Sequence, residues 1–181
     1  VIGVDVQLPI KRMTFKDAME KYGSDKPDLR FGMEITNITE AVKDMDFVVF
    51  KSAIENGGSI RALCLKGGAS LGRKPIDKLG EFVKTYRAKG LAWIQLKEEG
   101  VKSSLAKFLT DDVTENIVKT MGAETGDAIF IVADKDSVVL QSLGALRLEL
   151  AKQFDLIKDK NEFNFTWVTE FPFFEYSEEE E

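Results

Sequence analysis

Short apolar runs alternate along this chain with segments in which apolar residues recur every three or four positions. The runs are rich in strand-forming residues and cover 47–50, 60–65, 91–96 and 128–133. The periodic segments are typical of amphipathic helices and cover 75–86, 113–121 and 137–154. Since a glycine-containing turn at 56–59 separates the first two runs, we expect these runs to form a β-hairpin. The order β-β-α-β-α-β-α predicts an α+β fold, a two-layer sandwich of a mainly antiparallel sheet with helices on one face.

Local signals indicate where the helices begin and end. Thr14 and Asp17 have the spacing of a capping box, and we expect Gly23 to end the short helix that they start. In the same way, we expect Gly90 to end the helix over 75–86 and Gly122 to end the helix over 113–121.

The composition excludes several classes of function. The chain has a formal net charge of -6 and no histidine. An acidic chain does not bind nucleic acid through net charge, so any such contact must be local. Without histidine, imidazole catalysis and histidine-based zinc sites are excluded. Cys64 is the single cysteine and cannot form an internal disulfide, which favours a reducing compartment.

No apolar stretch approaches the roughly 20 residues that span a bilayer, and we expect a cytoplasmic protein without a membrane partner. The chain begins at Val1 and stops within an acidic run at 178–181, so we interpret it as a piece of a longer protein. Residues 163–174 form a strand-like aromatic segment broken by Pro172. Its five phenylalanines and one tryptophan are expected to pack on a part that lies outside this chain.

Several longer motifs resemble one family. They are YGSDKPDLRF at 22–31, GGASLGRKPID at 67–77, KGLA at 89–92, GDAIF at 126–130, LGALRL at 143–148 and WVTEFPFFE at 167–175. Together they resemble the GAD insertion domain of bacterial-type aspartyl-tRNA synthetases with short flanks of the catalytic domain. Glu170 departs from the pattern, since many members carry Asp at this position.

The resemblance implies a domain organisation and a parent enzyme. It implies a flank at 1–34, a GAD domain of the DCoH-like sandwich type at 35–156, and a returning flank at 157–181. The parent would be a homodimeric class II ligase that uses ATP and Mg²⁺ to form aspartyl-adenylate and then charges tRNA-Asp. The motifs that hold ATP and aspartate have no matching positions here. We therefore expect a catalytically inactive piece without a cofactor, which contacts the parent's catalytic domain and does not bind DNA.

A different host for the same domain is a tRNA-dependent amidotransferase, in which the GAD domain would serve as an RNA or protein interaction module. The flanking motifs at 22–31 and 167–175 argue against that host. A free-standing enzyme is disfavoured, because the chain lacks a paired acid-base motif.

Two clusters are candidate sites. Ser24, Asp25, Lys26 and Asp28 place two carboxylates and an ammonium in one short turn. They either order the entrance of an active site or form an ordinary structural turn. The second cluster is basic and faces only two carboxylates; it contains Lys66, Arg73, Lys74, Lys78, Lys84, Arg87 and Lys89. It either contacts the tRNA backbone or is the solvated face of a helix.

Acidic residues at two places resemble metal ligands only superficially. Asp111, Asp112 and Glu115 fall where a helix begins, and the helix macrodipole favours carboxylates there. The acidic run at 178–181 is typical of a solvated segment. We predict no metal site.

Overall fold

The computed structural model describes residues 3, 6 and 8–174. Its main part is a five-stranded sheet in which every neighbouring pair is antiparallel. The strand order is β2 (Thr36–Asn37), β3 (Ser59–Leu65), β6 (Ala128–Asp134), β4 (Ala92–Lys97) and β5 (Gly100–Ser103). The α+β class and the mainly antiparallel sheet are therefore confirmed.

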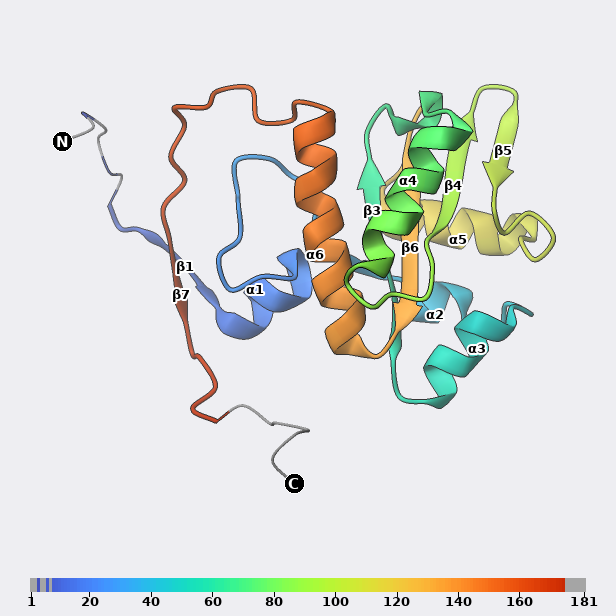
Figure 1. Ribbon diagram of the computed structural model, residues 1–181, viewed down its shortest axis with the longest axis horizontal. Coiled ribbons are helices and arrows are strands. Elements are labelled where there is room, and N and C mark those ends of the chain that lie inside the picture. The colour runs from blue at the N-terminus through green and yellow to red at the C-terminus, as the bar shows by residue number, and fades with distance from the viewer. Residues whose placement is uncertain (1–2, 4–5, 7, 175–181) are drawn as a thin grey trace.

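Helices cover both faces of this sheet. On one face, α4 (Arg73–Lys84) and α6 (Asp136–Gln153) share a core with Leu63 and Phe130. On the other face, α2 (Thr39–Val42), α3 (Val48–Glu55) and α5 (Asp111–Met121) share a second core with Ala62 and Ile131 (Figure 1). The expectation of helices on one face only must be corrected. The central strands β3 and β6 are nearly continuous apolar runs, as is typical of strands that are buried on both sides.

The run at 47–50 is not a strand, and the predicted hairpin with 60–65 is wrong. Residues from Val48 onward form α3, in which Phe50 is buried and its ring lies 5.0 Å from that of Phe47. A four-residue apolar run does not distinguish a strand from one side of a helix, and tertiary packing decides here. The tight antiparallel pair is instead formed by β4 and β5.

Two of the predicted helix ends are confirmed and one is not. Thr14 Oγ1 accepts a hydrogen bond from the Asp17 N–H at 3.0 Å, and α1 (Phe15–Tyr22) ends at Gly23. Gly122 ends α5 with a φ of 57°. Helix α4, however, ends before Gly90, because Arg87 adopts a φ of 71° and the chain turns there. The Ala88 N–H donates to the carbonyl of Val83, which is the hydrogen bond of a Schellman motif.

Residues near the two ends of the described chain form a small unit beside α6. Strand β1 (Lys11–Thr14) pairs in parallel with β7 (Thr166–Thr169), and α1 packs next to them. Figure 1 shows this unit on one side of α6 and the main sheet on the other. Aromatic side chains in β7 and after it are exposed, including Trp167 at 58% and Phe173 at 91%. The acidic run at 178–181 lies outside the described residues.

Candidate functional site

Helix α4 and the turn after it carry the cations here called the α4 basic face: Arg73, Lys74, Lys78 and Lys84 in the helix, and Arg87 and Lys89 beyond its end. All six side chains are exposed, because the apolar residues of the same helix, Ile76, Leu79 and Val83, point into the core. This is the spacing of an amphipathic helix. Arg73, Lys74, Lys78 and Lys84 thus lie on the exposed side of α4. Arg87 and Lys89 follow the end of the helix, and Lys89 lines a cavity beside α3.

Carboxylates neutralise only part of the α4 basic face. Arg73 Nε lies 3.5 Å from Asp77, and Lys84 Nζ lies 2.7 Å from Glu81. Within the described residues no ion pair includes Lys74, Lys78, Arg87 or Lys89. Uncompensated cations on a convex helix are suited to a polyanionic backbone.

Lys66 does not belong to this surface but to a structural cluster around Asp127. Its Nζ donates to Asp127 Oδ2 at 2.8 Å and to the carbonyl of Gly122 at 3.0 Å. The nearly buried Asp127 also accepts from the N–H groups of Gly67 and Glu124. Burial alone would raise the pKa of Asp127, but these hydrogen bonds, with that from Lys66 foremost, outweigh burial and hold the pKa below its usual value. Lys66 thus fastens the loop after β3 to the start of β6.

Cys64 lies beside the same carboxylate and is not a reactive thiol. Its Sγ lies 3.8 Å from Asp127 Oδ2. Burial, followed by the negative charge of Asp127, raises the pKa of the thiol to about 11. Because the thiolate is the nucleophilic form, Cys64 is unsuited to nucleophilic catalysis at neutral pH.

The turn at 24–28 is organised by its own hydrogen bonds. The Lys26 N–H donates to Ser24 Oγ at 3.0 Å. Asp28 accepts two hydrogen bonds from the guanidinium of Arg30, at 2.9 and 2.7 Å, and these lower the pKa of Asp28. The Asp28 carboxylate is therefore occupied by Arg30, a partner that the sequence did not predict. This geometry favours a structural turn. Within the part of the chain that the structure describes, no hydrogen bond or ion pair includes the Asp25 side chain.

Arg147 is a site residue that sequence reasoning missed. It lies in α6 and is 1% exposed, yet it carries a charge. Its guanidinium donates to backbone carbonyls of the segment 28–33: Nε to Met33 at 2.9 Å, and Nη2 to Asp28, Phe31 and Gly32 at 2.7, 3.0 and 3.1 Å. The sequence did contain a signal, since Arg147 interrupts the apolar stripe between Leu143 and Leu150.

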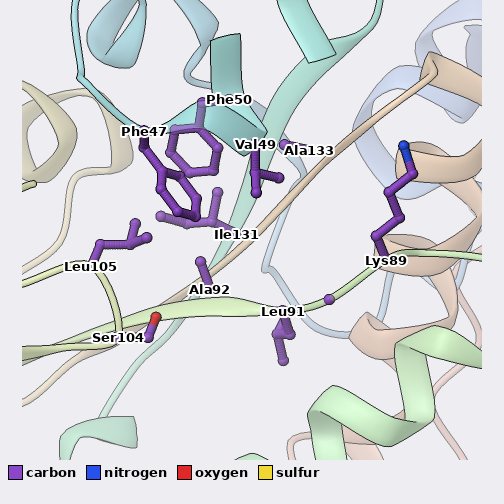
Figure 2. Close-up of a pocket in the computed structure, with 11 residues that line it drawn as sticks. Phe47, Val49, Phe50, Lys89, Leu91, Ala92, Ser104, Leu105, Ile131 and Ala133 are labelled. Carbon is purple, nitrogen blue, oxygen red and sulfur yellow. The ribbon is translucent and has the colours of Figure 1, made fainter. Parts of the chain in front are cut away.

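The apolar cavity shown in Figure 2 lies between α3 and the start of β4 and has a volume of about 250 Å³. Phe47, Phe50, Leu105 and Ile131 line it, and the amine of Lys89 points away from the two phenylalanine rings. The hydroxyl of Ser104, which also faces it, is already hydrogen-bonded to Trp93. No titratable group is directed at the cavity within the described lining, so the cavity has no acid-base chemistry of its own.

Residues 3, 6 and 8–174 contain neither a metal-binding cluster nor a helix that could span a membrane. No group of three His, Cys, Asp or Glu side chains is arranged there to hold a metal ion. Asp111 and Asp112 occupy the first turn of α5, directly after the cap residue Thr110. None of the described helices is both long and apolar enough to cross a bilayer.

Comparison with known proteins identifies relatives of the whole chain. The model of the GAD domain family matches residues 50–143. An aspartate–tRNA ligase of Clostridium botulinum (strain Eklund 17B / Type B) is 89% identical over 181 residues, and so is one from Clostridium beijerinckii. A third, from Clostridium perfringens (strain SM101 / Type A), is 71% identical over 180 residues. These alignments cover 99 to 100% of this chain but only 30% of each relative.

Proposed function

Because this chain belongs to the GAD domain family and aligns from end to end with aspartate–tRNA ligases, we propose that it is an accessory part of such a ligase. In this proposal residues 35–156 are the GAD domain, and 1–34 and 157–181 are flanks that join it to the catalytic domain. The identity of 89% extends through both flanks as well as the domain, which supports a ligase as the host. The parent ligase would be a cytoplasmic homodimer.

The flanks carry the proposed contact with the catalytic domain. A sheet of two strands, as formed by β1 and β7, is marginally stable in water without further packing. Trp167, Phe171 and Phe173 are exposed on or next to it. Apolar surface gathered in this way is typical of an interface. We propose that the remaining part of the ligase covers this apolar surface, since the chain spans only 30% of its relatives' length.

The chemistry of the parent would take place outside this chain. Aspartate activation needs sites for ATP and Mg²⁺, and the described residues hold no group of three metal-ligating side chains. The only cysteine has a raised pKa, and histidine is absent. We expect this chain alone to show no aspartate-dependent exchange of pyrophosphate into ATP, and measurable exchange above a blank would refute this part of the proposal.

The α4 basic face is the observation that supports a role in tRNA binding. Lys74, Lys78, Arg87 and Lys89 remain without an ion pair among the described residues, in a chain whose formal net charge is -6. Such local charge attracts phosphates even where the net charge repels them. We propose that this face contacts the tRNA backbone when the ligase binds its substrate.

Charge reversal in the complete ligase tests this contact. Lys74→Glu combined with Lys78→Glu should raise the KM for tRNA several-fold and make its dependence on salt less steep, because fewer phosphates are neutralised. The control is Lys102→Glu with Lys107→Glu, which changes the net charge equally at exposed positions away from α4. Equal effects of the two double variants, or no effect of the first, would exclude a specific contact.

A further inference from the structure

One charged side chain of the GAD domain, Arg147, connects the domain to its incoming flank. Among the residues that the structure describes, no ion pair includes Arg147, so backbone carbonyls alone accept hydrogen bonds from its guanidinium. Burial lowers the pKa of Arg147, but a guanidinium remains protonated in proteins. A buried charge is costly unless its hydrogen bonds are satisfied. The stability of this contact therefore depends on an arginine at position 147.

Two aromatic rings extend the contact from the loop to helix α1. The guanidinium carbon of Arg147 lies 4.0 Å from the ring centroid of Phe31 and 4.8 Å from that of Tyr22. Tyr22 is the last residue of α1 and also donates a hydrogen bond to Glu34 at 2.9 Å. Cations over aromatic faces are attracted by the ring quadrupole. Arg147 thus contacts the end of α1 and the following loop together.

The loop depends on these contacts for its conformation. Residues 28–33 contain no helix or strand, and Met33 has a φ of 69°, a left-handed conformation that is unfavourable for residues other than glycine. The Met33 carbonyl is one of those that Arg147 binds. Strain of this kind persists only where the surroundings determine the backbone.

The contact of Arg147 with the segment 28–33 is here called the joint. Helix α6 connects this joint to the α4 basic face. Leu143, Leu146 and Leu150 of α6 lie in the same core as Ile76 and Leu79 of α4. Figure 1 shows α6 between the flank unit and α4. Helices packed in a close-packed core move together, so a flank fixed to α6 is also fixed relative to α4.

We propose that Arg147 is a positioning residue: it holds the segment 28–33 to α6 and thereby sets the orientation of the α4 basic face relative to the flanks of the ligase. This inference rests on the proposed contact between that face and tRNA. A lysine cannot replace Arg147, because an ammonium lacks the planar fork that reaches several carbonyls and stacks on two rings. Loss of Arg147 should therefore weaken tRNA binding and leave aspartate activation intact.

The test uses the complete ligase with Arg147→Lys and Arg147→Met. Both variants should raise the KM for tRNA about tenfold while kcat and aspartate-dependent ATP–pyrophosphate exchange stay within about twofold, the pattern of lost uniform binding. Amide hydrogen exchange should become faster in 24–34 and stay unchanged in β6. Lys152→Met, at an exposed position on the same helix, is the control and should change none of these values.

Three outcomes would overturn the inference: an unchanged KM for tRNA with faster exchange in 24–34, full activity of Arg147→Lys, or loss of ATP–pyrophosphate exchange equal to the loss of tRNA charging. If the Arg147 variants unfold, Phe31→Leu serves instead, since it removes one of the two aromatic rings beside the guanidinium while Arg147 stays in place. It should raise the KM for tRNA to a smaller extent, and an unchanged KM counts against the joint. The charge-reversal variants of α4 separate the two proposals. A normal KM for tRNA in those variants, with a raised KM in Arg147→Lys, would refute both the basic-face contact and the orienting of that face, and only the hold of Arg147 on the segment 28–33 would stand.

Discussion

Gly144 in α6 and Gly23 at the end of α1 lie in direct backbone contact. A Cβ on Gly144 would come within 2.8 Å of the carbonyl oxygen of Gly23, a distance that real Cβ atoms do not show. Gly144 is one turn before Arg147, so both residues lie where α6 contacts α1 and the segment that follows it.

Gly144→Ala should therefore destabilise the chain. Alanine favours helix by about 1 kcal/mol, but pushing two backbones apart in a packed core costs typically about 1–3 kcal/mol, and the second effect should prevail. The control is Gly80→Ala in α4, where no atom lies within 4 Å of the added Cβ. That variant should gain up to about 1 kcal/mol. Urea unfolding of both variants measures this, and a stabilised Gly144→Ala would contradict the close contact.

Arg87→Gly should stabilise the chain. Arg87 holds the left-handed position of the Schellman motif after α4, with a φ of 71°. A residue with a Cβ pays roughly 1 kcal/mol for this conformation, whereas glycine does not. Thermal unfolding should show a higher midpoint for Arg87→Gly. Arg87→Ala removes the same charge but keeps the strain, so an equal gain in that variant would attribute the effect to charge and not to the backbone.

Asp127→Asn should reduce stability most at neutral pH. The native pKa of Asp127 lies below that of the unfolded chain, about 3.9. Its contribution is thus complete above this value and disappears as the pH falls through the native pKa. Hydrogen bonds to a charged group contribute about 1.5–3 kcal/mol, so the variant should lose about this amount at pH 7. The difference from the wild type should shrink below about pH 4.

The matched control for Asp127 is Asp46→Asn. Asp46 pairs with Lys51 at 2.7 Å, but its side chain is 92% exposed, and such pairs contribute little. Unfolding measured from pH 3 to pH 7 should show almost no change for this variant. A pH-independent loss in Asp127→Asn would mean that the carboxylate charge is not what stabilises the loop.

Cys64 should be alkylated slowly. With a pKa of about 11, its thiolate fraction at neutral pH is roughly 300-fold below that of an ordinary cysteine with a pKa of about 8.5. The rate of reaction with iodoacetamide should keep rising between pH 7 and pH 9.5. The urea-unfolded chain provides the reference rate, and a native rate close to it at pH 7.5 would refute the raised pKa.

Most helices and strands were predictable because their signals are local. The stripes of α4, α5 and α6 follow the helical period, and Thr14, Gly23 and Gly122 act on backbone groups a few positions away. The wrong strand at 47–50 shows where such signals fail. Four apolar residues fit either element, and α3 forms because Phe47 and Phe50 bury their rings beside a strand distant in sequence.

Some features of the candidate sites follow from the local sequence, and others depend on residues that are distant in the chain. Four cations of the α4 basic face, Arg73, Lys74, Lys78 and Lys84, share one helix, so the helical period groups them. Lys66 precedes that helix, and its role was decided by Asp127, which lies 61 positions away. Likewise, the turn at 24–28 was recognisable, but the Asp28 carboxylate is bound by Arg30 and the Asp28 carbonyl by Arg147.

The sequence by itself determined most element types, the ends of α1 and α5 and the family, since these depend on side-chain periods, short-range hydrogen bonds and contiguous motifs. Only the tertiary structure decided that the sheet is covered on both faces and that Arg147 of α6 binds the carbonyls of the segment 28–33. The hydrogen bonds of Arg147 span 114 to 119 positions. Contacts over such separations form only when the whole core closes, because the chain between them must be ordered first. No local sequence pattern predicts which carbonyls accept hydrogen bonds from a buried guanidinium.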